Sequence, residues 1–189
     1  MTIDFESIEK TLGYKFNNKN LLEQAFIRRS YSIENGGQNN EVLEFIGDSA
    51  LDLAVIRIMM EYFGEIPEIK NVQGFIFRSP KHFRTKLDEG QFTKIKEGIV
   101  KNQFLAKCIE TYGFQKQLLM GDGDIKQKVQ KNESTKAALF EAIIGALALD
   151  CNWNMDIISR VIKNLIDFED YFKNIGLNNY FIKKITDYF

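Results

Sequence analysis

The stretch NNEVLEFIGDSALDL, residues 39–53, decides the fold and carries the most informative pattern in the chain. It opens a proline-free, mostly apolar run from Glu41 to about Phe63, which predicts one long helix. Within this run, carboxylates recur at spacings of three, four and four residues, at Glu41, Glu44, Asp48 and Asp52. Such spacings place all of these acids on one face of the helix.

An acidic stripe on an otherwise apolar helix is costly, because like charges at these spacings repel and burial raises their pKa values. The helix dipole favours acids in the first turn, which accounts for Glu41 and Glu44 but leaves Asp48 and Asp52 unexplained. A cation would compensate the charge, and oxygen ligands favour a hard ion such as Mg²⁺ or Mn²⁺. From this helix alone, a solvated acidic face and a metal site both remain open.

A second apolar helix is predicted from about Ser134 to Leu149, and its carboxylate favours the metal site. Within AALFEAIIGALAL, residues 137–149, Glu141 is the only polar side chain. An uncompensated buried carboxylate costs on the order of several kcal/mol. Pairing of Glu141 with Lys136 or Lys131 is the alternative, but one cation site shared by the two helices explains the acids of both.

Each of the two helices also contains a glycine close to its acids. Gly47 precedes Asp48, and Gly145 follows Glu141 by one turn. Glycine inside a helix costs about 1 kcal/mol relative to alanine. Close approach of the two helices would offset that cost and bring the acids together, and simple weakening of each helix is the alternative.

Composition bounds the class of protein. The chain has 189 residues, an apolar fraction of 44% and a formal charge of -1, so we expect one ordinary domain whose nucleic-acid contacts, if any, are local. Cys108, Cys151 and His82 stand apart in the sequence, which argues against zinc. The acidic start MTIDFESIEK and the lack of long apolar runs predict no membrane association and a cytoplasmic or nuclear location.

The rest of the chain also has helical spacing, and no run of period-two alternation stands out. Further helices are expected over residues 5–12, 19–29, 91–100, 103–112 and 155–172. Residues 65–85, which include both prolines, are expected to be irregular, and the polar stretch 121–134 is expected to be mobile. Residues 173–189 carry an apolar stripe, and we expect this tail to pack as a helix.

The motifs resemble those of the ribonuclease III family. The run NNEVLEFIGDSALDL resembles the family signature, and ALFEAIIGALALD, residues 138–150, resembles its second acidic motif. Further similarity covers residues 12–37 and 87–107, in the order typical of the family. The resemblance implies an all-α fold, the helical fold of the ribonuclease III endonuclease domain, over residues 1–172. Residues 173–189 would form the C-terminal tail, which is too short for a double-stranded-RNA-binding domain.

The resemblance also assigns roles to individual residues. Glu44, Asp48 and Glu141 match metal-binding acids, and Glu41 matches the first glutamate of the signature, so these four form the expected catalytic set. Phe45 matches an aromatic that inserts into a socket on the partner subunit. The implied activity is hydrolysis of double-stranded RNA by a homodimer that uses Mg²⁺ or Mn²⁺.

Three departures from the family pattern stand out. Ala138 occupies the position of a family aspartate, Arg28 replaces a common histidine, and residues 65–85 form a longer segment than compact bacterial relatives have. Ala138 can reflect natural loss or an engineered substitution. The expected function is therefore a double-stranded-RNA endonuclease that is weakened by Ala138. The alternative is an inactive relative that keeps the fold for RNA binding or dimerisation.

Overall fold

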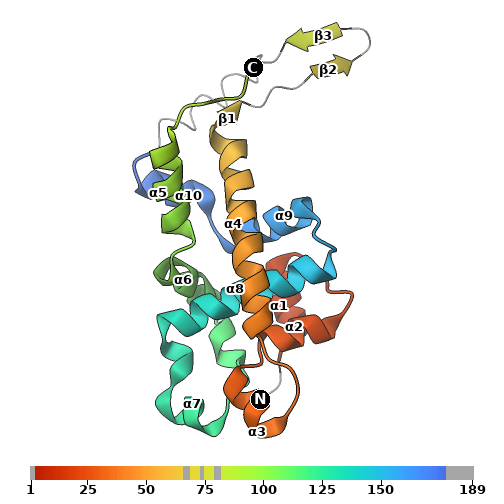
Figure 1. Cartoon of the computed structure of the whole chain (residues 1–189), viewed down its shortest axis with the longest axis vertical. Helices are drawn as coiled ribbons and strands as arrows, with labels where there is room; N and C mark the ends of the chain where they lie inside the picture. The colour runs from red at the N-terminus through yellow and green to blue at the C-terminus, as the bar shows by residue number, and fades with distance from the viewer. Residues whose placement is uncertain (1–2, 66–68, 73–74, 79–81, 178–189) are drawn as a thin grey trace.

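The computed structural model describes residues 3–65, 69–72, 75–78 and 82–177, and helices make up most of this part of the chain (Figure 1). The predicted all-α class is confirmed. Among the described helices, none combines the length and the apolar character that a membrane crossing requires.

The helices follow one another along the chain with short connections. The α-helices are α1 (Phe5–Leu12), α2 (Lys19–Ala25), α3 (Arg29–Asn35), α4 (Glu41–Phe63), α5 (Glu89–Ile99), α6 (Asn102–Tyr112), α7 (Asp122–Gln127), α8 (Glu133–Asp150), α9 (Met155–Leu165) and α10 (Phe168–Asn174). Two 3-10 turns, η1 (Phe114–Gln117) and η2 (Val129–Lys131), flank α7. The strands are β1 (Gly64–Glu65), β2 (Ile69–Val72), β3 (Phe75–Arg78) and β4 (Arg84–Thr85).

The centre of the fold is the packing of α4 against α8. Figure 1 shows α4 running along the long axis of the molecule and crossing α8, with α1 and α2 on one side and α6 and α7 on the other. Nearly all of α8 is buried, as its continuous apolar sequence requires, whereas α4 buries one face and exposes the other. The exposed face of α4 is therefore available for contacts beyond the core.

Local signals fix the ends of several helices. Asp88 and Gln91 form a reciprocal capping box at the start of α5. The side chain of Asn154 accepts hydrogen bonds from two backbone N–H groups at the start of α9. Because these caps depend only on neighbouring residues, they can be read from the sequence.

Two expected helices are each divided into two in the structure. The run 19–29 divides into α2, which ends at Ala25, and α3, which begins at Arg29, because Ile27 forms a parallel bridge with Leu119. The run 155–172 divides into α9 and α10, since the side chain of Asp167 caps a new helix. The long helices α4 and α8 agree with the prediction to within one residue at each end.

The polar stretch 121–134 is ordered, contrary to expectation. It forms α7, η2 and the first residues of α8. The side chain of Asp124 accepts hydrogen bonds from Arg28 and Ser30, and the backbone N–H of Asp122 donates to Glu34. These long-range contacts have no periodic signature, so the sequence pattern could not predict them.

In the described part of residues 65–85, short strands replace the irregular structure that the sequence predicts. β1 pairs with β4 in antiparallel register, Gly64 opposite Thr85, and β2 pairs with β3, Ile69 opposite Arg78. The strands are two to four residues long, too short for a clear alternation in sequence. This segment, which we call the insert (residues 64–86), continues from the end of α4, and β2 and β3 lie beyond the body of helices (Figure 1).

The expected tail helix falls mainly on residues 178–189, which lie outside the described residues. In the described part, α10 continues through Lys173 and Asn174, and Leu177 packs against the core.

Candidate metal centre

The two glycines near the acids are the points at which α4 and α8 meet. A Cβ atom added at Gly47 would overlap the carbonyl oxygen of Glu141, and one added at Gly145 would overlap the carbonyl oxygen of Leu43. The backbones are therefore in direct contact, and no larger residue fits at either position. The predicted close approach of the two helices is confirmed.

This approach brings the expected site residues into one place. A hollow of about 440 Å³ is lined by Glu41, Glu44, Phe45, Asp48 and Glu141. The first four come from the first two turns of α4, and Glu141 comes from the middle of α8. Acids that lie far apart in the sequence thus surround one small volume.

Ala138 lies one helical turn before Glu141, on the same side of α8. It is partly buried, in contrast to most of its neighbours in α8, which are fully buried. A longer side chain at this position would extend from the same face as Glu141. The family resemblance implies a carboxylate at this position, which alanine does not provide.

The charges in the hollow perturb one another. Burial, and then the negative charges of Asp48, Glu44 and Asp52, raise the pKa of Glu141 to about 7. Burial also raises the pKa of Glu44, and the charge of Arg28 partly opposes this shift. Near neutral pH and without a cation, Glu141 is therefore protonated in some molecules and ionised in others.

Asp52, the acid of the α4 stripe that does not line the hollow, has a protein partner. Lys96 of α5 donates to Asp52 over 2.6 Å, so this carboxylate is compensated without a metal. Lys136, the lysine considered as a partner for Glu141, instead pairs with Glu110 of α6. In the described part of the chain, Glu141 makes no ion pair, so its charge is neutralised either by protonation or by a cation from outside the protein.

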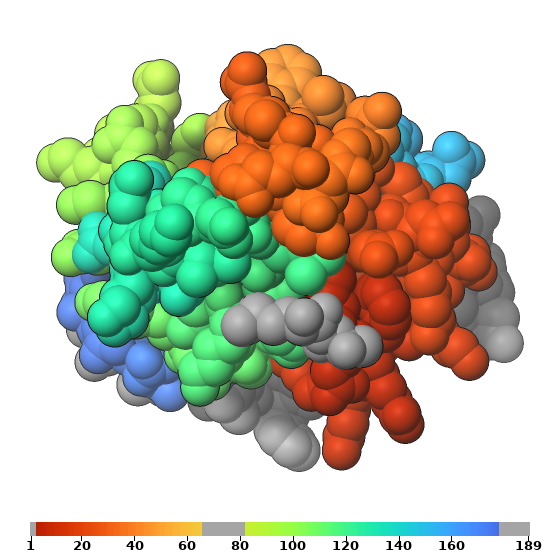
Figure 2. All heavy atoms as spheres, turned by 90° about the horizontal axis from the view of Figure 1, so that it is seen from below, coloured from red at the N-terminus to blue at the C-terminus, as the bar shows by residue number. Residues whose placement is uncertain are grey.

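Two arginines flank the hollow, and the spacing of residues in the sequence predicts no role for either of them. Arg29 lies 3.5 Å from Glu41. The Nε atom of Arg28 donates to Asp124 over 2.9 Å, and Ser30 donates to the same carboxylate over 2.7 Å. Seen from below, the segment around α7 lies directly beside the segment that contains α3 (Figure 2). Arg28 was noted as a departure from the family histidine, which was the one available signal.

The carboxylate oxygens around the hollow are the type of ligand that a hard divalent ion prefers. Four carboxylates from two helices line one hollow, and among the described residues Glu141 has no protein cation to balance it. Within the described residues, however, no three His, Cys, Asp or Glu side chains are close enough together to form a ready-made metal site. Like charges repel one another, so an ion in this hollow would require the carboxylates to lie closer together than they do here.

Comparison with known proteins identifies the family. A family model described as Ribonuclease-III-like matches residues 18–166, which include all the residues of the hollow. The chain belongs to the ribonuclease III family. Two curated relatives, each named Ribonuclease 3, support this: the protein from Roseburia hominis is 45% identical over 159 residues, and that from Treponema succinifaciens is 40% identical over 167 residues.

The match to these ribonuclease III proteins covers only part of their length. It includes 82% and 88% of this chain, but 44% and 42% of the two relatives. A solved nuclease domain of ribonuclease III from Campylobacter jejuni superimposes with a TM-score of 0.69 at 26% identity, covering 87% of this chain and 96% of that one. That nuclease domain shows structural flexibility in a region involved in dimer formation. The endonuclease-domain fold expected from the resemblance is thus confirmed.

Proposed function

We propose that this chain is a metal-dependent endonuclease domain that cleaves double-stranded RNA as a homodimer. The observation that carries the proposal is the hollow between α4 and α8. There Glu44, Asp48 and Glu141 converge, and Glu141 lacks a cationic partner among the described residues. Membership of the ribonuclease III family supports the same reaction.

Glu44, Asp48 and Glu141 would hold Mg²⁺ or Mn²⁺. A divalent ion in such a centre polarises the phosphate, lowers the pKa of a water molecule and stabilises charge on the leaving oxygen. Ion binding would require Glu141 to be ionised. Without an ion, the carboxyl group of Glu141 releases its proton as the pH rises through about 7. Asp48 is exposed at the rim of the hollow, where an incoming RNA backbone would lie.

Arg28 and Arg29 supply the positive charge next to the acids. Arg28 is held by Asp124, and Arg29 lies beside Glu41. Guanidinium groups suit the phosphates of an RNA backbone. A-form RNA is recognised mainly by shape, through phosphates and 2′-hydroxyl groups, so local cations of this kind suffice in a chain with a formal charge of -1.

The outer face of α4 supports the homodimer. Phe45 is 76% exposed, although it is a large aromatic residue, and Val42, Leu53 and Ile56 on the same helix are also exposed. An apolar patch of this kind on a folded domain is typical of an interface. Two-fold contacts are the commonest arrangement of homo-oligomers, and here they would place Phe45 at the interface.

Ala138 favours a second candidate function. With one family carboxylate missing, the domain could bind double-stranded RNA or dimerise without cleaving. Two features count against this second function. The other three acids remain, and Glu141 is half-buried without a protein cation, although burying a carboxylate costs free energy. The endonuclease is therefore the function that the geometry supports best.

The test is cleavage of a long double-stranded RNA in the presence of Mg²⁺ and, separately, Mn²⁺. We expect slow cleavage with Mg²⁺, faster cleavage with Mn²⁺, and none when both ions are chelated. Glu44→Gln should abolish cleavage, whereas Glu6→Gln, which changes an exposed acid of α1 outside the hollow, should leave it unchanged. RNA binding with no cleavage under either ion would support the second candidate and overturn the first.

A further inference from the structure

Backbone hydrogen bonds on both sides of Arg28 place this residue beside the start of α4. Its own backbone N–H donates to the carbonyl oxygen of Leu119 over 3.0 Å. The carbonyl oxygen of the preceding residue, Ile27, accepts from the backbone N–H of Asn40 over 2.8 Å, and Asn40 directly precedes α4. The start of α3 is therefore joined to the end of α4 that carries the acids of the hollow.

The side chain of Arg28 is held through only one of its nitrogen atoms. The Nε–H group donates to Asp124, and the hydroxyl of Ser30 donates to the same carboxylate oxygen. The Ser30 hydroxyl also accepts from the backbone N–H of Gly121 over 3.1 Å, which fixes its position. Within the described part of the chain, the two Nη groups of Arg28 make no hydrogen bond. The guanidinium is thus oriented by the protein and keeps free donors.

The charge of Arg28 acts on the hollow. Burial raises the pKa of Glu44, and the positive charge of Arg28 opposes this shift. This effect of Arg28 on Glu44 is larger than that of Glu41 or of Asp48, each of which is one turn away on the same face of α4. Because electrostatic interaction weakens with distance, the guanidinium lies close to Glu44, which lines the hollow.

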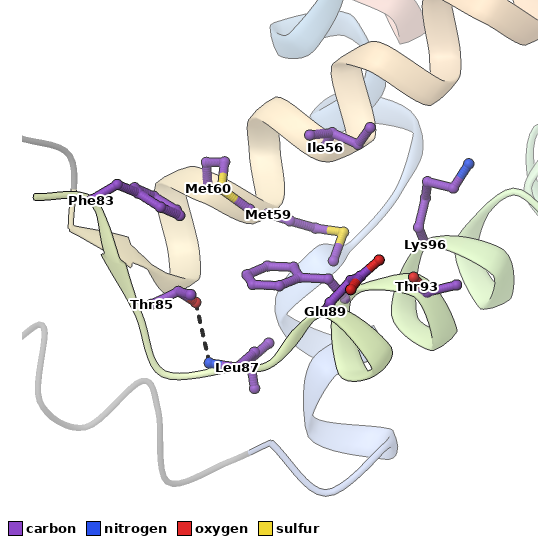
Figure 3. Close-up of a pocket in the computed structure, with 10 residues that line it drawn as sticks. Ile56, Met59, Met60, Phe83, Thr85, Leu87, Glu89, Thr93 and Lys96 are labelled. Carbon is purple, nitrogen blue, oxygen red and sulfur yellow. Dashed lines mark hydrogen bonds between the residues drawn. The ribbon is translucent and has the colours of Figure 1, made fainter.

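The other cations beside the acids of α4 are arranged differently. The Arg29 side chain is 66% exposed and lies near Glu41, whereas the Arg28 side chain is 26% exposed. Lys96 donates to Asp52. Figure 3 shows Lys96 extending from α5 away from the apolar side chains of a pocket of about 480 Å³ at the far end of α4. Of these three cations, Arg28 is the one that combines a fixed planar group with a place beside the hollow.

We propose that Arg28 binds the reacting phosphate of the RNA in the transition state, and that Asp124 and Ser30 position its guanidinium for this contact. The inference rests on the proposed function and adds which cation acts on the reacting group and what orients it. Hydrolysis joins a water oxygen to phosphorus and breaks the bond to the leaving oxygen, which receives one proton of that water. Negative charge grows on the phosphate oxygens during this step, and a guanidinium that is already oriented stabilises it without further ordering.

Steady-state cleavage of long double-stranded RNA with Mn²⁺ separates the two arginines. Arg28→Ala should lower kcat by about 100-fold or more with little change in KM, because the lost contact exists only in the transition state. Arg28→Lys, which keeps the charge without the planar fork, should restore part of the lost kcat. Arg29→Ala should raise KM and affect kcat little, because an exposed and loosely held cation contributes to binding alone.

Variants in α7 test the positioning. Asp124→Ala should lower kcat by about tenfold, and combining it with Arg28→Ala should cause no further loss, because Asp124 acts through the arginine. Glu34→Ala is the matched control, since Glu34 accepts a hydrogen bond from Asp122 of the same helix without touching Arg28, and it should leave kcat unchanged. Heteronuclear NMR gives a readout without RNA. The Nε–H proton of Arg28 should exchange slowly with water in the unmodified chain and rapidly in Asp124→Ala.

The outcomes separate this inference from the proposed function. If the unmodified chain cleaves RNA and Arg28→Ala changes KM alone or nothing, the proposed function stands and the role of Arg28 is overturned. Additive losses for Arg28→Ala and Asp124→Ala, or an equal loss in Glu34→Ala, would overturn the positioning. An unmodified chain that cleaves with neither ion would remove both the proposed function and this inference. Circular dichroism and thermal melting confirm that each variant is folded, and Asp124→Asn replaces Asp124→Ala if the latter is not.

Discussion

At the scale of single residues, Ala138 and Glu141 are the positions of α8 on which the proposed metal centre depends. They lie one turn apart on α8, and only Glu141 carries a charge into the hollow. A missing outer-shell partner typically lowers metal affinity or activity by about 10- to 100-fold, and a missing direct ligand lowers it further. The proposal therefore predicts that the alanine weakens metal binding at this centre.

Restoring the carboxylate tests this account. We expect Ala138→Asp to raise double-stranded-RNA cleavage by at least about tenfold at fixed Mg²⁺ concentration, because the added ligand strengthens metal binding. Ala138→Asn has the same size without the charge and should give a smaller gain. Initial cleavage rates of the three proteins measure the effect. Equal rates for the original and the aspartate variant would show that another group supplies the ligand.

The raised pKa of Glu141 makes stability depend on pH. Because its pKa in the folded chain is about 7 and its ordinary value is 4.5, the unfolded chain releases this proton first. In the absence of metal, this group therefore lowers stability progressively as the pH rises from about 4.5 to about 7. Above that range the loss is complete.

Glu141→Gln should remove this loss. We expect the variant to melt a few degrees higher than the unmodified chain at pH 8 without metal, and at about the same temperature at pH 4.5. Added Mg²⁺ should raise the melting temperature of the unmodified chain and have little effect on the variant. Calorimetry at the two pH values measures both effects. A variant that melts lower at pH 8 would contradict the assignment of an uncompensated charge.

At the scale of elements, the contact between α4 and α8 determines whether the acids meet. Glycines at positions 47 and 145 let the backbones touch, and the acids lie within one turn of that contact. Separation of the helices by one methyl group would therefore change both stability and the geometry of the hollow. Stability and function are coupled at this crossing.

Gly47→Ala tests the crossing. The added methyl group would overlap the Glu141 carbonyl oxygen, so the free energy of unfolding should fall by roughly 2–4 kcal/mol despite the better helix propensity of alanine. Gly123→Ala in α7 is the matched control, because nothing lies within 4 Å of its added Cβ, and it should be neutral or slightly stabilising. Urea denaturation measures both. Equal stability of the two variants would mean that the helices separate without cost.

At the scale of the whole molecule, one helix carries two surfaces. The acids lie near the start of α4, and the exposed apolar face runs along the same helix to the pocket at its end. A dimer formed through this face would fix the positions of two acidic centres relative to each other. Cleavage of both strands of a duplex should therefore depend on the dimer.

The dependence of cleavage on the dimer can be measured directly. Phe45→Ala should lower dimer stability, and its cleavage rate per chain should rise with protein concentration, since only dimers place two centres on one duplex. The unmodified chain should show a constant rate per chain at micromolar concentration. Ile33→Ala serves as the control. A concentration-independent rate for Phe45→Ala together with a measured loss of dimer would show that single subunits cleave.

The sequence by itself determined the central helices, the family and the identity of the acids. The boundaries of α4 and α8 follow from long proline-free runs, and the glycines at positions 47 and 145 predicted their contact because glycine inside a helix needs a compensating reason. The motif around Glu44 and Asp48 is a local pattern. Features of this kind depend on residues within a few turns of one another, and they can be read directly from the chain.

Only the tertiary structure decided which charges are compensated and where the apolar surfaces lie. The pairing of Asp52 with Lys96, the anchoring of Arg28 by Asp124 and the elevated pKa of Glu141 each depend on residues that are distant in the sequence. The strands of the insert, too short to give a periodic signal, were likewise visible only in the fold. The physical reason is that ion pairing, burial and the pairing of short strands are set by distances in space, which local spacing does not encode.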